Sequence, residues 1–259
     1  MEKLAKKGKQ EKEPIEQKNV VIEIKNLKKS FGNLKVLDGI ELKLHEKENL
    51  VVLGKSGSGK SVLIKCIVSL LKHDKGSIKV GKHELTDISD EDLIKVRKKI
   101  GFLFQGAALY DSMTVRENLT FALSRIKEKF SKEEINDKII EALDNVGLPD
   151  SIDKMPSELS GGMKKRIGLA RTLVVHPEII LYDEPTTGLD PITSNEISDL
   201  INETKAKFNN SSIIITHDIN CVKKVADRII MIKDGKIYKE GTLEEFTNDD
   251  DTYIQSFFK

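Results

Sequence analysis

Short apolar runs recur along the chain, separated by polar segments and glycine-containing turns. Residues 36–44 alternate between apolar and polar positions, which is typical of a half-buried antiparallel strand. The runs at 50–53, 100–104, 178–183 and 212–216 are nearly continuous in apolar residues, as expected for strands buried on both faces. We therefore predict a sheet that is antiparallel near the N-terminus and mainly parallel in its core.

Helical periodicity separates these strands and dominates the segment from about 107 to 176. Within that segment, Ser131 and Glu134 form a capping box that predicts the start of a helix. Because strands alternate with helices, we predict one α/β domain over 19–259. Its mostly helical segment, about 107–176, is inserted between strands of the sheet.

Both ends of the chain are rich in charged residues. Residues 1–18 contain many lysines and glutamates, and we expect a disordered tail because they cannot bury enough apolar area. Residues 244–251 are also acidic, and Phe257 and Phe258 follow them. We expect this C-terminal stretch to be a solvated tail with a small docking patch.

The composition indicates a protein with a well-solvated surface. Charged residues make up 33% of the 259 positions, and the net charge of +1 gives no field that would favour nucleic acid as a partner. No apolar run approaches the roughly 18 residues that a spanning helix needs, and the N-terminus lacks the apolar core of a signal peptide. We expect the chain to remain in the cytosol, with Cys66 and Cys221 as buried, reduced thiols.

The most specific motif follows the apolar run at 50–53. It reads Gly54-Lys55-Ser56-Gly57-Ser58-Gly59-Lys60-Ser61, and Val62 continues into an apolar helical segment. In this strand–loop–helix context, G-x-x-x-x-G-K-[ST] predicts a loop whose backbone N–H groups converge on phosphate. We expect Lys60 to reach the β- and γ-phosphates and the Ser61 hydroxyl to bind Mg²⁺.

Asp183 is the last residue of the run at 178–183, and Glu184 follows it directly. Ligands of parallel sheets bind beyond the carboxyl ends of the strands, so these carboxylates are expected to share the crevice of the phosphate loop. We predict that Asp183 binds Mg²⁺ and that Glu184 is the base that polarises the attacking water. The alternative is a pair of strand-end acids that cap the following turn.

Two more polar residues follow buried strands. Gln105 comes after 100–104 and can meet Mg²⁺ or the attacking water through its side-chain amide. His217 comes after 212–216 and can donate to the γ-phosphate or position Glu184. The alternatives are an ordinary loop glutamine and a structural or exposed histidine.

A second candidate anion site is Ser160-Gly161-Gly162, which opens a predicted helix. The chain has one phosphate loop, so this site makes sense if it covers the γ-phosphate bound to another subunit. A simple helix cap with a glycine turn is an equally good interpretation of the spacing alone.

Together these residues resemble the ATP-binding subunit of an ABC transporter, from about residue 20 to residue 241. In chain order they are Phe31, the phosphate loop, Gln105, Leu159-Ser160-Gly161-Gly162, Asp183-Glu184, Thr187-Gly188-Leu189-Asp190 and His217. The resemblance implies a P-loop NTPase fold with an N-terminal antiparallel β subdomain and an inserted α-helical subdomain, and it implies ATP and Mg²⁺ as cofactors. It also implies that Phe31 stacks on adenine and that Asp190 belongs to the nucleotide site. In the implied head-to-tail dimer, each ATP lies between one phosphate loop and the partner's Ser160 and Gly162.

A finer resemblance concerns the type of transporter. The segments 104–118, 160–163 and 190–194 are similar to those of the Mla/Mce-associated phospholipid transport ATPases. This family implies a separate transmembrane permease, an Mce-type lipid-binding protein, and a location on the cytoplasmic face of the inner membrane. A regulatory subunit that contacts the C-terminal stretch is a further candidate partner. The alternatives are the ATPase of a small-solute or amino-acid importer and a non-transport ABC ATPase.

Overall fold

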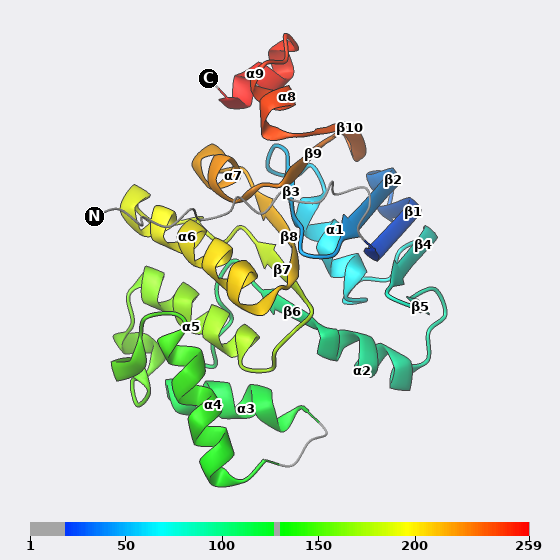
Figure 1. Ribbon diagram of the computed structural model, residues 1–259. Coiled ribbons are helices and arrows are strands. Elements are labelled where there is room, and N and C mark those ends of the chain that lie inside the picture. Colours follow the sequence, from blue (N-terminus) through cyan, green and yellow to red (C-terminus); the bar gives the residue numbers. More distant parts are fainter. Residues whose placement is uncertain (1–18, 127–129, 259) are drawn as a thin grey trace, which may run out of the picture.

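The framework of the protein consists of two sheets of different character (Figure 1). The computed structural model describes residues 19–126 and 130–258, so the predicted disordered tail at 1–18 lies outside the described residues. One sheet is antiparallel, with the order β2-β1-β4-β5, and comprises β1 (Val20–Phe31), β2 (Leu34–His45), β4 (Lys75–Val80) and β5 (His83–Glu84). The predicted antiparallel N-terminal part is therefore confirmed.

The second sheet has six strands in the order β10-β9-β3-β8-β7-β6. All neighbours in it are parallel except the hairpin of β9 and β10. Its strands are β3 (Asn49–Leu53), β6 (Ile100–Leu103), β7 (Ile179–Asp183), β8 (Ser211–Thr216), β9 (Arg228–Lys233) and β10 (Lys236–Gly241). The mainly parallel core agrees with the prediction from the sequence.

Alternate residues of β3 face two different hydrophobic cores, which explains why its sequence is continuously apolar. Leu50 and Val52 belong to the core that the six-stranded sheet shares with the antiparallel sheet and α1 (Lys60–Ile67). Val51 and Leu53 belong to the core on the other face, which the later helices cover. The strand is thus fixed from both sides, and so is the start of the loop that follows it.

Helices cover the sheets and build the inserted segment. They are α2 (Asp90–Lys99), α3 (Val115–Ser124), α4 (Lys132–Asp144), α5 (Gly161–Leu173), α6 (Pro191–Phe208), α7 (Ile219–Val225), α8 (Leu243–Thr247) and α9 (Thr252–Phe258). The capping box of Ser131 and Glu134 starts α4, as predicted, and Thr114 and Glu117 form another at α3. In Figure 1, α3 and α4 lie at the end of the molecule farthest from α8 and α9. No described helix is long and apolar enough to cross a bilayer.

The C-terminal stretch differs from the expected solvated tail. It folds into α8 and α9, with Phe246 completely buried and Ile254 almost completely buried. Both residues join the core that contains Val51 and Leu53. The segment is acidic overall, but its few apolar residues are spaced so that they fall on one face of each short helix. Burial of these side chains is enough to anchor α8 and α9 on the core.

Candidate functional site

The phosphate loop lies between β3 and α1 and depends on two glycines. A Cβ atom on Gly54 would lie 2.5 Å from the carbonyl oxygen of Ile232, and one on Gly59 would lie 2.7 Å from that of Val36. Gly59 also has a φ of 101°, a backbone conformation that residues with side chains rarely adopt. Larger residues at either position would push the loop away from its neighbours.

Lys60 is the first residue of α1 and its ammonium group is buried in the loop. Nζ donates to the carbonyl oxygens of Gly54 at 2.7 Å and Lys55 at 3.0 Å, and it lies 3.9 Å from Oε1 of Glu184. Burial lowers the pKa of Lys60, while the nearby carboxylates of Glu184 and Asp183 oppose that shift. The ammonium is thus held in a fixed position, and an ammonium is a type of group that binds phosphate.

The predicted magnesium ligands are joined directly. Ser61 Oγ donates to Oδ1 of Asp183 at 2.9 Å, which brings together a hydroxyl and a carboxylate oxygen from α1 and β7. Oxygen pairs of this kind suit Mg²⁺. In the same loop, Ser58 Oγ is buried and has no hydrogen-bond partner among the described residues. The residues therefore fit a magnesium ion and a phosphate ligand.

Glu184 has an unusual backbone and several partners. Its φ of 51° lies in the left-handed region, and its N–H donates to the Ile215 carbonyl oxygen at 2.9 Å. Its Oε2 lies 2.9 Å from Nδ1 of His217 and accepts from the Thr187 hydroxyl at 3.1 Å. Strained backbone held by surrounding contacts is found at functional sites, where it fixes a reactive side chain.

Most of the predicted site residues line one pocket of about 570 Å³. The predicted site residues that line this pocket are Lys55, Ser56, Gly57, Gly59, Lys60, Ser61, Val62, Gln105, Glu184 and His217. The parallel pairing explains this, because the carboxyl ends of β3, β6, β7 and β8 lie at one edge of the sheet. Gln105 and His217 thus line the same pocket as the phosphate loop, although neither belongs to a distinctive local motif in the sequence.

The segment Ser160–Gly162 lies outside the residues that line this pocket. Ser160 caps α5 by accepting from the Met163 N–H at 3.2 Å. A Cβ on Gly162 would lie 2.5 Å from Cγ2 of Thr193, so the start of α5 packs closely on the start of α6. Within one chain, the second candidate anion site is therefore separate from the phosphate loop.

Phe31 and Asp190 are also outside the lining of the pocket. Phe31 ends β1 with 48% of its surface exposed, and the Lys29 ammonium lies 5.4 Å from the ring centroid. Asp190 caps α6, and its bonds to the hydroxyl and N–H of Thr193 lower the pKa of its carboxyl. Adenine stacking on Phe31 and a nucleotide role for Asp190 remain predictions.

Lys165 contacts two residues of the pocket and is absent from the candidates that the sequence predicts. It is buried in α5, and its Nζ donates to the carbonyl oxygens of Gln105 and, at 3.2 Å, Glu184. Burial lowers the pKa of Lys165, opposed by the carboxylates of Asp183 and Glu184. A signal was present, because a lysine four residues before Leu169 falls on the apolar side of the helix. It ties α5 to two residues of the pocket.

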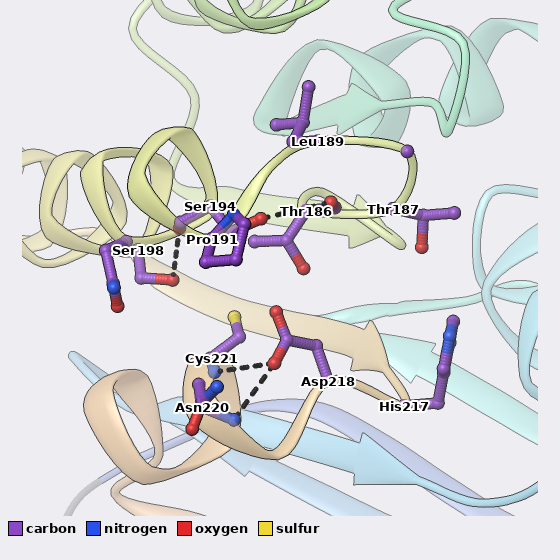
Figure 2. Close-up of a pocket in the computed structure, with 12 residues that line it drawn as sticks. Thr186, Thr187, Leu189, Pro191, Ser194, Ser198, His217, Asp218, Asn220 and Cys221 are labelled. Atoms are coloured by element: carbon purple, nitrogen blue, oxygen red, sulfur yellow. Dashed lines mark hydrogen bonds between the residues drawn. The ribbon is translucent and has the colours of Figure 1, made fainter.

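A smaller cavity of about 280 Å³ lies beside His217 (Figure 2). One wall is the segment 186–191 at the start of α6, and the other is the start of α7, where Asp218 accepts from the N–H groups of Asn220 and Cys221. Thr186 Oγ1 is buried there without a hydrogen-bond partner among the described residues. Each wall is thus fixed by the cap of its own helix.

Known proteins are similar to this chain in sequence and fold. The ABC transporter family model matches residues 37–187, which is more than half of the chain. The chain is 39% identical over 256 residues to Protein TRIGALACTOSYLDIACYLGLYCEROL 3, chloroplastic, of Arabidopsis thaliana, with 92% of this chain and 73% of the relative covered. It is 36% identical over 225 residues to the methionine import ATP-binding protein MetN of Clostridium tetani, with 87% and 70% covered.

A solved structure of the ATP-binding cassette MJ0796, a dimeric post-hydrolysis state bound to ADP and Pi, has a TM-score of 0.79 and 32% identity to this chain. The similarity covers 86% of this chain and 98% of that one. The pocket described above therefore occurs in a fold that is known with nucleotide. From the family match and this likeness, the chain belongs to the ABC transporter family and is an ATP-binding subunit that hydrolyses ATP.

Proposed function

We propose that this chain works as a pair of copies that hydrolyse ATP to drive phospholipid transport through a separate transmembrane permease. The observation that carries the pairing is the separation of Ser160–Gly162 from the pocket that holds Lys60 and Glu184. One chain therefore has two complementary half-sites that do not meet. A head-to-tail pair brings each Ser160–Gly162 segment over the phosphate loop of the other copy.

The residues of the pocket have distinct tasks in the proposed reaction. Ser61 and Asp183 would hold Mg²⁺, which would neutralise phosphate charge, and Lys60 would add a second positive charge. Glu184, oriented by His217, accepts a hydrogen bond from the attacking water and aligns it with the γ-phosphate. The Ser160 hydroxyl and the N–H groups at the start of α5 complete the site from the other copy.

A groove of about 830 Å³ is the proposed docking site of the permease. Its walls come from α2, β6, α3 and α5 and carry the stacked pair of Phe102 and Phe104 and the edge-to-face pair of Tyr110 and Phe121. These aromatic side chains fit an amphipathic helix of the partner. Gln105 immediately follows Phe104, so movement at the nucleotide site reaches the groove through one short segment.

Phospholipid as the cargo rests on the sequence similarity of 104–118 to the Mla/Mce-associated ATPases. The Arabidopsis thaliana relative, which is named after trigalactosyldiacylglycerol, a lipid, supports this choice. In the proposed assembly, the pair of ATPase copies lies on the cytoplasmic face of the inner membrane. An Mce-type lipid-binding protein and a regulatory subunit are the further proposed partners.

Amino-acid import is the second candidate, because the similarity to a methionine import ATP-binding protein is nearly as high. The motor residues would be the same and the permease would differ. The percentage of sequence identity to these relatives does not distinguish phospholipid from amino acid as the cargo, because the cargo contacts the permease and not the nucleotide site.

Purification from detergent-solubilised membranes distinguishes these cargoes. The chain is captured through a tag, co-purified subunits are identified, and bound lipid is extracted and quantified. We expect a permease, an Mce-domain protein and enriched phospholipid. Reconstituted into proteoliposomes, the complex should show ATP hydrolysis that responds to phospholipid and not to methionine, and the reverse response would contradict the proposed cargo.

A further inference from the structure

A ladder of aromatic rings leads from β10 to the phosphate pocket. The rings of Tyr238 and Tyr253 meet edge to face with centroids 5.4 Å apart, and Tyr253 and Phe257 repeat this geometry at 5.4 Å. The Lys233 ammonium lies 4.3 Å from the Tyr238 centroid and 4.1 Å from the Tyr253 centroid. In Figure 1, α9 accordingly lies beyond the hairpin of β9 and β10.

The end of this ladder enters the nucleotide site. Ser256 and Phe257 line the same pocket as Lys60 and Glu184. The Lys55 ammonium of the phosphate loop lies 5.1 Å from the ring centroid of Tyr253. The C-terminal helix α9 therefore covers part of the phosphate site of its own chain.

The contacts between α9 and the phosphate loop are weak non-covalent contacts of aromatic rings. Among the described residues, the hydrogen bonds of 252–258 stay within the C-terminal segment. The Gln255 side chain, for example, donates to the carbonyl oxygens of Thr247, at 3.1 Å, and Asp249, at 2.5 Å. Toward the loop, α9 offers ring contacts, which are worth less than buried hydrogen-bonded ion pairs. Its anchor, Ile254, packs in the core beside α8.

We propose that α9 is an autoinhibitory element that competes with the second copy for the open face of the nucleotide site. This inference rests on the proposed head-to-tail pairing. The partner's Ser160–Gly162 must approach the phosphates over the pocket that Phe257 lines, so α9 and the partner compete for the same space. The phosphates of ATP also attract the Lys55 ammonium away from the Tyr253 ring, and thus ATP loosens α9 before the copies close.

A matched pair of variants tests the competition. Phe257→Ala removes a ring that lines the pocket. Phe258→Ala removes a ring that is not part of the pocket lining and whose centroid lies 6.0 Å from that of the Phe246 ring. Both are placed in a Glu184→Gln chain, so that bound ATP persists, and dimerisation is measured by sedimentation at increasing ATP–Mg²⁺. We expect Phe257→Ala to lower the ATP concentration for half-maximal dimerisation by about threefold to tenfold, as loss of an aromatic contact permits. Phe258→Ala should leave it unchanged.

Hydrogen exchange gives a second measurement on the intact chain. On addition of ATP–Mg²⁺ to the Glu184→Gln protein, we expect faster amide exchange in residues 252–258, because α9 leaves the pocket. Unchanged or stronger protection there overturns the proposal, as does equal or weaker dimerisation of Phe257→Ala, or an equal gain from Phe258→Ala. If no variant dimerises with ATP at any concentration, the pairing itself fails and autoinhibition fails with it, so the two failures are distinguishable.

Discussion

Glu184 Oε2 and His217 Nδ1 are 2.9 Å apart, although 33 positions separate the two residues in the chain. Adjacent parallel strands bring them together, because β7 ends just before Glu184 and β8 just before His217. The Glu184 backbone N–H also bonds to the Ile215 carbonyl oxygen at 2.9 Å. Backbone and side chain thus fix this carboxylate beside the phosphate pocket.

Glu184→Gln should abolish most of the hydrolysis and leave ATP binding intact. The amide keeps the shape of the side chain but cannot polarise water as a carboxylate does, so we expect kcat to fall by about 100-fold or more. Steady-state ATPase assays and equilibrium binding of ATP measure the two quantities separately. Unchanged turnover would exclude Glu184 as the base.

Mixing two inactive variants should restore activity if each site is shared between copies. Lys60→Ala removes the cation of the phosphate loop, and Ser160→Arg blocks the start of α5. With random pairing, half of the dimers are mixed and each mixed dimer has one intact site, so about a quarter of wild-type ATPase activity is expected. The assay is repeated on each variant alone as a control, and no recovery on mixing would contradict the shared site.

Lys165→Met should disturb both stability and catalysis, because it removes the buried ammonium that donates to the carbonyl oxygens of Gln105 and Glu184. We expect a loss of about 1–3 kcal/mol in the free energy of unfolding and a lower kcat with little change in KM. Lys164→Met, one residue earlier on α5, is the matched control, and Lys165→Arg should restore part of kcat. Equal effects of Lys164→Met and Lys165→Met would show that no positioning role exists.

The two buried thiols should make stability fall in strongly alkaline solution. Burial raises the pKa of Cys66 and of Cys221 from 9.0 to about 11 each. A raised folded-state pKa gives stability that is present below pH 9 and is lost as the pH rises toward 11, by up to about 1.4 kcal/mol per pH unit for each thiol. Urea unfolding from pH 8 to 11 measures this slope.

The same titration of a Cys66→Ala/Cys221→Ala double variant removes the contribution of other groups. We expect the double variant to be less stable at pH 8, because it leaves small cavities, but to lose less stability between pH 9 and 11. Parallel curves for the two proteins would show that the thiols do not titrate in this range.

Local patterns in the sequence are sufficient for most elements and for the phosphate loop. The strand at Asn49–Leu53, the glycines and Lys60 are neighbours in the chain, so their chemistry is visible without a fold. The capping box at Ser131 is equally local, because it depends on residues three positions apart. The predicted antiparallel and parallel parts follow from the period of apolar residues.

Contacts between residues far apart in the chain were not predictable from these local patterns. The Lys165 ammonium donates to the carbonyl oxygens of Gln105 and Glu184, which lie elsewhere in the chain. Phe257 lines the pocket, although the acidic residues before it predict a solvated tail. Such contacts arise from strand order and helix packing, which join residues far apart in sequence. Local sequence is therefore enough to predict the fold class, the phosphate loop and the candidate residues. Which of these residues share one pocket, and which helix covers it, follows from the packing of the folded chain.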